Sequence, residues 1–268
     1  MVLGSDGLPT VWDGQRLVTT VPTCSPTPCP AYVTEAPARI SIDPSSFVAT
    51  GATPGTGQVA LPAGRTAATV LESGFDPATG LRWGRYGGGV VALLDRIGGT
   101  AGSTLDVTSQ NLHLIIGPTQ TGPITLPTIG TFTYANVGGT KPTDNLGSAA
   151  GTLNSATLVA NFGTQSVDTG VNLTVNGQTW AAGATAVPIQ SGQFTASRDL
   201  STGSGNLNVC AGASCGTTTL PTASSANTAG RILGSFTGSS GQGAGIAYSL
   251  NQGGLTGTTV SGVAAFKR

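Results

Sequence analysis

The fold of this chain is decided by residues 166–180, which read SVDTGVNLTVNGQTW. In residues 166–175, valine, threonine and leucine at the odd positions alternate with glycine or more polar residues at the even positions. A period of two is the signature of a β-strand with one buried face. Asn176-Gly177 follows directly, and an Asn-Gly pair between two such runs is the strongest short signal for a hairpin. The stretch therefore predicts two antiparallel strands joined by a tight turn.

Short strands of this kind continue in both directions from about residue 71 to the end of the chain. Strands are predicted at 80–86, 90–97, 111–116, 131–134, 156–162, 166–175, 178–180, 205–210, 230–236, 243–250 and 258–266. No long helix is expected. We predict an all-β fold in which residues 71–268 form a small antiparallel β-barrel of about eight strands, with a β-sandwich as the alternative.

Several predicted strands contain glycine, as at Gly234, Gly245 and Gly262. Isolated strand glycines mark bulges and tight bends, which a small closed barrel needs at its corners. Closure also removes exposed strand edges, which benefits a surface with little charge. The glycines therefore favour the barrel over the sandwich.

Residues 1–70 have little periodicity and many turn-forming residues, including prolines at 22, 26, 28 and 30. Short strands are predicted only at 16–21 and 39–42. We interpret residues 1–70 as an extended N-terminal segment or arm that packs on a barrel rather than folding alone.

The composition excludes several classes of protein. Charged residues are 8% of the 268 residues, against a usual ~25%. Eleven Lys and Arg balance eleven Asp and Glu, so no excess of positive charge is present for binding nucleic acid. With 42 glycines and 16 prolines the chain does not resemble a helical bundle, and 38% hydrophobic residues argue against charge-driven disorder.

The four cysteines form two close pairs in sequence, Cys24 with Cys29 and Cys210 with Cys215. Turn-forming spacers, Ser-Pro-Thr-Pro and Ala-Gly-Ala-Ser, let the sulfurs of each pair approach. Three connectivities exist, of which we favour the two local disulfides. A single four-cysteine zinc site is the alternative, although most structural zinc sites have shorter spacings. Disulfides imply an oxidising compartment, so an extracellular, cell-surface or periplasmic location is expected.

Several segments of residues 71–268 carry a resemblance to a bacterial family. They are residues 80–86, 112–118, 137–145, 235–238, 243–250 and 260–266. Together they resemble the C-terminal region of FecR-domain-containing proteins of proteobacteria. The last two also resemble the closing barrel strands of transferrin-binding-protein-like surface lipoproteins. The resemblance implies a secreted or envelope-associated barrel, and by analogy a haem or iron source as its ligand.

The candidate contact residues are Trp83, Arg85, His113, Trp180 and Tyr248. The three aromatic side chains can line a ligand pocket or fill the barrel core, and Arg85, like Arg82, can pair with a carboxylate. His113 is the only histidine, so it could serve a metal, a haem or a catalytic triad, or be held by hydrogen bonds. No nucleophile elbow, carboxylate pair or metal-ligand cluster accompanies it. The sequence predicts no enzyme, no cofactor and no metal.

Two functions fit these observations. The first is a non-enzymatic secreted or envelope-associated bacterial module that binds a ligand or a partner protein through barrel loops or the barrel mouth. The alternative is a structural subunit that self-assembles into a fibre or surface layer, with residues 1–70 as the connecting arm. The neutral composition favours self-association because little charge keeps copies apart.

Overall fold

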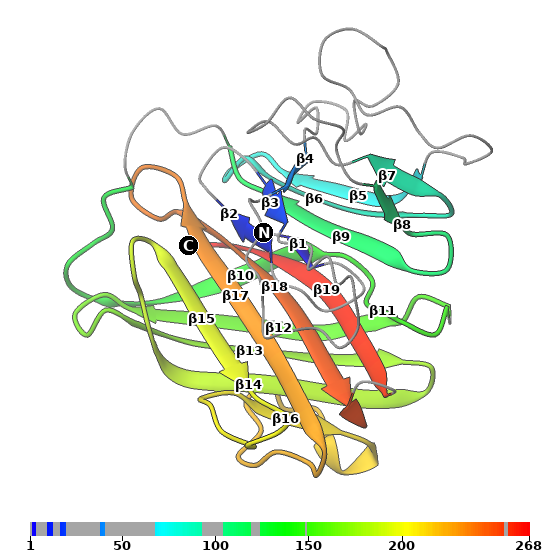
Figure 1. The fold of residues 1–268 in the computed structure, drawn as a ribbon. Coiled ribbons are helices and arrows are strands. Elements are labelled where there is room, and N and C mark those ends of the chain that lie inside the picture. The colour runs from blue at the N-terminus through cyan, green and yellow to red at the C-terminus, as the bar shows by residue number, and fades with distance from the viewer. Residues whose placement is uncertain are drawn as a thin grey trace, which may run out of the picture.

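The computed structural model describes residues 68–92, 104–118, 124–147, 149–254 and 257–268, and the backbone of four short strands before residue 41 (Figure 1). Those four strands are β1 (Val2–Leu3), β2 (Thr10–Trp12), β3 (Leu17–Thr19) and β4 (Ala38–Ile40). Every other regular element in the described part is a β-strand, apart from one 3₁₀ turn at Ala213–Cys215. The described part contains no helix that is long and apolar enough to cross a bilayer. The prediction of an all-β fold is confirmed.

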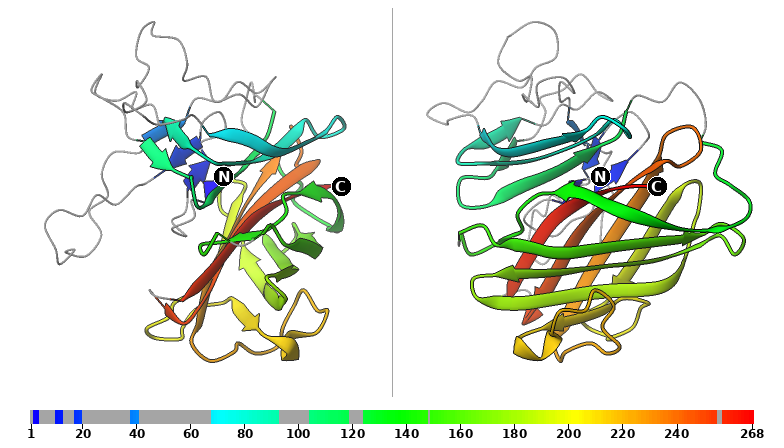
Figure 2. Two further views of the ribbon diagram at one scale, coloured as in Figure 1. Left: turned by 90° about the vertical axis from the view of Figure 1, so that its right-hand side faces the viewer. Right: turned by 180° about the vertical axis from the view of Figure 1, so that it is seen from behind.

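A ten-stranded antiparallel sheet forms the main body of the molecule. Its strands are β10 (Thr131–Gly139), β11 (Thr143–Asp144), β12 (Thr152–Asn161), β13 (Ser166–Val175), β14 (Gln178–Pro188), β15 (Gln193–Arg198), β16 (Asn208–Ala211), β17 (Thr228–Thr237), β18 (Gly243–Gln252) and β19 (Thr258–Lys267). The order across the sheet is β15-β17-β18-β19-β10-β12-β13-β14-β16, and β11 lies beside β19. The sheet curls until its two ends meet, as the views in Figure 2 show.

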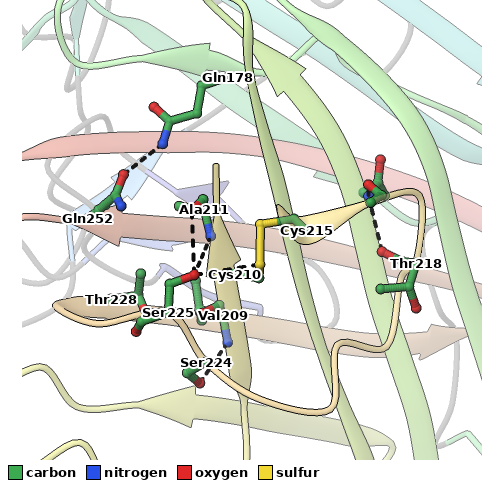
Figure 3. The surroundings of a disulfide bond; sticks show 12 residues. Gln178, Val209, Cys210, Ala211, Cys215, Thr218, Ser224, Ser225, Thr228 and Gln252 are labelled. Carbon is green, nitrogen blue, oxygen red and sulfur yellow. Dashed lines mark hydrogen bonds between the residues drawn. A yellow bond between two sulfur atoms is a disulfide. The ribbon is translucent and has the colours of Figure 1, made fainter. Parts of the chain in front are cut away.

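The two ends of the sheet are joined by hydrogen bonds around β15 and β16 rather than by a full ladder. The Leu207 N–H donates to the Ser197 carbonyl at 3.2 Å, directly beyond a bridge between Arg198 and Gly205. On the edge of β16 that does not pair with β14, the hydroxyls of Ser224 and Ser225 accept the backbone N–H groups of Val209 and Ala211 (Figure 3). Because these contacts replace strand pairing, the sheet is a nearly closed barrel, which confirms the predicted fold class.

The stretch that decided the prediction forms the β13–β14 hairpin. Strand β13 spans Ser166–Val175 as predicted, and Asn176 and Gly177 have φ values of 49° and 74°. Positive φ at both central residues is the signature of a type I′ turn, whose twist matches that of the strands. Strand β14 runs to Pro188, beyond the predicted 178–180, because its later residues pair with β13 across a register shift.

The inside of the barrel is filled by side chains. Trp180, Tyr248, Phe162, Phe236 and Phe266 are among its fully buried residues. The rings of Phe162 and Phe236 lie 5.5 Å apart in a tilted pair, a favourable geometry for aromatic contacts. The barrel interior is therefore a packed core.

The strand glycines have a different role from the one predicted. The ladders of β17, β18 and β19 run in continuous register through Gly234, Gly245 and Gly262, so no bulge lies there. At Gly234 and Gly262 the missing side chain leaves room for the rings of Phe194 and Tyr248 on neighbouring strands. The expectation of bulges at these positions was wrong, because the ladders continue in register and the glycines instead leave room for side chains of neighbouring strands.

A second, four-stranded sheet lies against the outer face of the barrel (Figure 2). Its order is β1-β9-β6-β5, with β5 at Thr69–Asp76, β6 at Leu81–Gly87 and β9 at Asn111–Ile116. The apolar cluster between the two sheets consists of Leu81, Trp83, Ile115, Ala247, Val263 and Ala265. The segments 80–86 and 111–116, predicted among the barrel strands, thus form a separate layer, which we call the side sheet.

Two small sheets complete the described structure. One joins β2, β3 and β4, where short strands were predicted at 16–21 and 39–42. The other pairs β7 (Val90–Ala92) with β8 (Thr104–Asp106). The strand predicted at 90–97 is confirmed in its first part, since residues 93–97 lie outside the described residues.

The local disulfide Cys210–Cys215 is present, with Cα atoms 5.5 Å apart (Figure 3). Cys24 and Cys29, the other predicted pair, lie outside the described residues. Directly after Cys215, residues 216–220 form a strap across the outer face of β13 and β14. The Asn172 amide donates to the carbonyls of Gly216 and Thr218, each at 3.1 Å. The disulfide and this asparagine together fix the strap on the barrel.

Because the strap lies close to β13, the stability of the fold should depend strongly on Gly170. The Thr219 carbonyl occupies the space that a Cβ atom at Gly170 would need. Gly170→Ala should therefore lower the free energy of unfolding by about 1–3 kcal/mol in denaturant titrations, as overpacked sites do. Gly163→Ala is the matched control, because its nearest neighbour is a side-chain oxygen at 3.3 Å. Equal stability of the two variants would contradict the tight contact.

Candidate functional site

The structure separates the five candidate residues into two groups. Trp83, Arg85 and His113 lie between the side sheet and the barrel, on β6 and β9. Trp180 and Tyr248 lie inside the barrel, on β14 and β18. The structure does not bring the five residues together into one pocket.

Trp83 fills the space between the two sheets. Its ring occupies the positions that Cβ atoms at Gly74 of β5 and Gly138 of β10 would take. The side chain is 8% exposed. The two glycines permit this position, so Trp83 packs the side sheet onto the barrel.

Arg85 pairs with a carboxylate, as its residue type allowed. Its Nε donates to Glu72 Oε2 at 3.2 Å, and an Nη donates to Asn111 Oδ1 at 2.9 Å. The same Glu72 oxygen accepts the backbone N–H of Lys141 at 3.0 Å. This ion pair links β5 and β6 to the segment after β10. Arg82 instead stacks over the Phe75 ring, 4.1 Å from its centroid.

His113 is fully buried and hydrogen-bonded at both ring nitrogens. Nδ1 lies 2.7 Å from Thr140 Oγ1, and Nε2 lies 2.8 Å from Thr143 Oγ1. Thr140 Oγ1 also accepts the Val263 N–H at 3.2 Å, which connects the ring to β19. Burial lowers the pKa of His113 to about 3, with a smaller contribution from the positive charge of Arg85. The imidazole is therefore neutral across the physiological range.

These contacts do not fit a metal or haem ligand. Both ring nitrogens of His113 are occupied by threonine hydroxyls, and the ring has no exposed surface. The described residues contain no group of three or more His, Cys, Asp or Glu side chains that could hold a metal ion. Binding of a haem or iron source, which the resemblance implies, stays a prediction, and His113 is not free to act as its ligand.

Trp180 and Tyr248 are part of the barrel core. Both are 0% exposed. The Tyr248 ring lies over Gly262, and no hydrogen-bond partner lies within reach of its buried hydroxyl among the described residues. Burial raises the pKa of Tyr248. That a ligand contacts Trp83, His113, Trp180 or Tyr248 stays a prediction. All four side chains are buried within the protein.

Sequence reasoning missed a surface cleft at one end of the barrel. It has a volume of about 580 Å³ and lies between three segments, 124–128, 162–165 and 189–192. Its lining residues are Ile124, Thr125, Leu126, Pro127, Thr128, Phe162, Gly163, Gln165, Ile189, Ser191 and Gly192. The volume falls within the ~300–1,000 Å³ range of small-molecule and cofactor sites. The one available signal was the set of apolar residues in the segment 124–129, which lies outside any predicted strand.

The cleft is lined by uncharged residues. Ile124, Leu126 and Ile189 are partly buried and supply apolar walls, whereas Gln165 and Ser191 are exposed polar residues. Next to it Ile129 is 77% exposed, which is unusual for so large an apolar side chain. The site can therefore accept an apolar group flanked by hydrogen-bonding groups, and it offers no charge to an ionic ligand.

The segments around the cleft are held to the barrel end by hydrogen bonds. The Thr125 N–H donates to the Ser239 carbonyl at 3.0 Å, and the Tyr134 hydroxyl donates to the Gly241 carbonyl at 2.6 Å. The Phe162 N–H donates to the Gly130 carbonyl at 2.9 Å. Such anchoring reduces the conformational entropy lost on binding, so the cleft is preorganised.

The depressed pKa of His113 predicts a pH-dependent stability. The unfolded chain binds a proton below the ordinary histidine pKa of 6.5, while the folded chain does so only near 3. The free energy of unfolding should therefore fall as the pH drops from 6.5 toward 3, and be about 2 kcal/mol lower near pH 5 than near pH 8. Denaturant titrations across this range measure it.

His113→Asn is the control for this slope. Asparagine keeps a polar side chain near Thr140 but does not titrate, so the variant should be less stable at neutral pH and lose most of the slope above pH 5. The Thr79 hydroxyl lowers the pKa of Asp76, so the ionised carboxylate stabilises the fold. That stabilisation is lost only when Asp76 becomes protonated, at lower pH than the range of this slope. An unchanged slope in His113→Asn would contradict the assignment to this imidazole.

Two tyrosines provide a matched pair for the buried hydroxyl. Tyr248→Phe removes a hydroxyl with no protein partner, so the free energy of unfolding should stay the same or rise by up to about 1 kcal/mol. Tyr134→Phe removes the hydrogen bond to Gly241 and should lower it by about 1 kcal/mol. A larger loss in Tyr248→Phe than in Tyr134→Phe would show that the Tyr248 hydroxyl has a bound partner.

No protein-family model matches the chain, and a search of curated proteins found no match. The resemblance to the C-terminal region of FecR-domain-containing proteins stays a prediction from the sequence.

Proposed function

We propose that this chain is a non-enzymatic binding module of the bacterial exterior or envelope, which contacts a partner protein through the cleft end of its barrel. The observation that carries the proposal is the neutral cleft between segments 124–128, 162–165 and 189–192. It combines apolar walls, exposed polar residues and hydrogen-bonded support. Preorganised clefts with this mixture are typical of binding sites.

The packed interior supports binding at the loops rather than inside the barrel. Trp180, Tyr248, Phe162 and Phe236 are fully buried in the core. A ligand in the interior would have to displace these side chains, which costs several kcal/mol for each large aromatic. The barrel then serves as a rigid support for the loops at its end.

The exposed surface beside the cleft favours a protein partner over a small molecule. Ile129 presents 77% of its surface outside the cleft, so the apolar region extends beyond a single small pocket. An uncharged peptide segment with one apolar side chain fits this arrangement, since that side chain can enter the cleft and its neighbours can cover Ile129.

The disulfide supports the proposed location. Cys210–Cys215 joins the end of β16 to the strap, and such bonds persist in oxidising compartments. An extracellular, cell-surface or periplasmic location agrees with a binding role outside the cytoplasm.

A peptide selection tests the proposal. Phage-displayed random peptides selected on the full chain should be enriched in uncharged sequences with an apolar residue. Ile129→Lys combined with Ile189→Lys should weaken the selected peptides at least about tenfold in fluorescence-anisotropy titrations, since a buried apolar contact is worth about 1.4 kcal/mol or more.

Leu146→Lys is the matched control for this selection. Leu146 is 62% exposed and lies on the loop after β11. Asn145 of this loop is hydrogen-bonded to Gly257 and Thr259 at the turn of the β18–β19 hairpin, at the end of the barrel away from the cleft. Peptides that bind the Ile129→Lys, Ile189→Lys variant as tightly as the unchanged protein would overturn the cleft as the binding site.

A further inference from the structure

We propose that two copies of this chain associate through strand β5, pairing antiparallel about a two-fold axis so that their side sheets form one continuous sheet. The surface lies on the side sheet and not at the cleft, so this inference is independent of the peptide-binding proposal. It also differs from assembly through an extended N-terminal arm, because the contact is made by one strand of the side sheet, β5.

Strand β5 is an edge strand with apolar residues on its surface. In the described part of the chain β6 is the one strand that pairs with β5, and no other described strand lies along the second edge of β5. The exposed fractions of Val70, Leu71 and Phe75 are 41%, 49% and 47%. An open edge of this kind presents backbone N–H and C=O groups that a second strand can pair with.

The pairing with β6 defines which face each β5 side chain occupies. Val70 lies opposite Tyr86 and Phe75 lies opposite Arg82, and residues 82 and 86 share one face of β6. Val70 and Phe75 therefore lie on the same face of β5, although they are five positions apart. The register shift between Val70 and Glu72, which leaves Leu71 as an extra residue, makes this arrangement.

This bulge makes β5 complementary to itself. With the two-fold axis at Ser73, Ser73 faces Ser73 of the second copy, and Glu72 faces Gly74 of the second copy. Beyond the bulge, Val70 then faces Phe75 of the second copy, and symmetry repeats this apolar pair. Each strand thus covers Val70 and Phe75 of the other, and cross-strand pairs of a β-branched and an aromatic residue stabilise sheets.

Charge favours this register over its neighbour. Shifting the axis to Gly74 would place Glu72 opposite Asp76 of the second copy, and like charges directly opposite are destabilising. In the proposed register Glu72 faces a glycine, and its carboxylate is already paired with Arg85. The formal net charge of the chain is zero, so little long-range repulsion opposes association.

Light scattering with size-exclusion chromatography tests the association. The full chain should elute with twice its 26.3 kDa mass at high protein concentration. Val70→Lys combined with Phe75→Lys should give a monomer with an unchanged far-ultraviolet circular dichroism spectrum, because both side chains are already exposed within one copy. Leu146→Lys, which changes an exposed leucine elsewhere, should remain a dimer.

Cysteine cross-linking tests the register. Facing residues in an antiparallel pair have Cα atoms about 4.5–5.5 Å apart, which suits a disulfide. Ser73→Cys should therefore give covalent dimers under mild oxidation on non-reducing gels. Thr69→Cys should not, because the two copies of residue 69 would lie about 20 Å apart. The unchanged protein is run in parallel to measure any background from its own cysteines.

Three results would overturn the proposal. They are a monomer at every concentration, a dimer that the two lysines leave intact, and cross-linking of Thr69→Cys without cross-linking of Ser73→Cys. Loss of peptide binding at the cleft would leave this test unaffected, since Ile129 and Ile189 lie on the barrel and not on β5.

Discussion

Close approach of two β-layers is the constraint on which the rest of the structure depends. The outer faces of β18 and β19 carry small side chains, among them Gly245, Ala247 and Ala265, where the side sheet lies. A Cβ atom at Gly245 would lie 2.8 Å from Cδ1 of Ile115 on β9, so even alanine would require the Ile115 side chain to shift. Because both faces of β18 are covered over most of its length, nearly all of its residues are buried. The barrel core and the contact between the sheets are thus built on the same strands.

That close approach explains why His113, which lies between the layers, is hydrogen-bonded at both ring nitrogens. His113 has no access to water, so each ring nitrogen needs a partner from the protein, and Thr140 and Thr143 supply them. The Arg85–Glu72 pair lies nearer the rim, where its side chains are 13% and 22% exposed. The neutral group lies at the dry centre and the charged pair at the wetter edge, as the cost of burying charge requires. A histidine that resembled a ligand in the sequence is therefore a structural link between β9, the segment after β10 and β19.

Local patterns predicted much of this fold, whereas contacts between distant segments could not be predicted. Alternation and the Asn-Gly turn placed β13 and its hairpin correctly, because those signals act between neighbouring residues. The same signals cannot say which sheet a strand joins, so β6 and β9 were assigned to the barrel. They also cannot distinguish a glycine that bends a strand from one that admits a distant ring, as at Gly234. The cleft was missed for a related reason: it is formed by three loops that only the closed barrel brings together.

A packed barrel with few charges limits where recognition can take place. The interior is filled by rings such as Trp180, and the faces of β18 and β19 are covered by the side sheet. Among the surfaces that stay available in the described part are loops at the barrel ends, and strand edges that closure does not remove. The cleft beside Ile129 belongs to the first kind, and β5 belongs to the second. Barrel closure protects the edges of the main sheet with the short contacts around β15 and β16, but the side sheet has no such closure. Among the described strands, the edge of β5 is therefore the place that we propose for backbone hydrogen bonding between molecules.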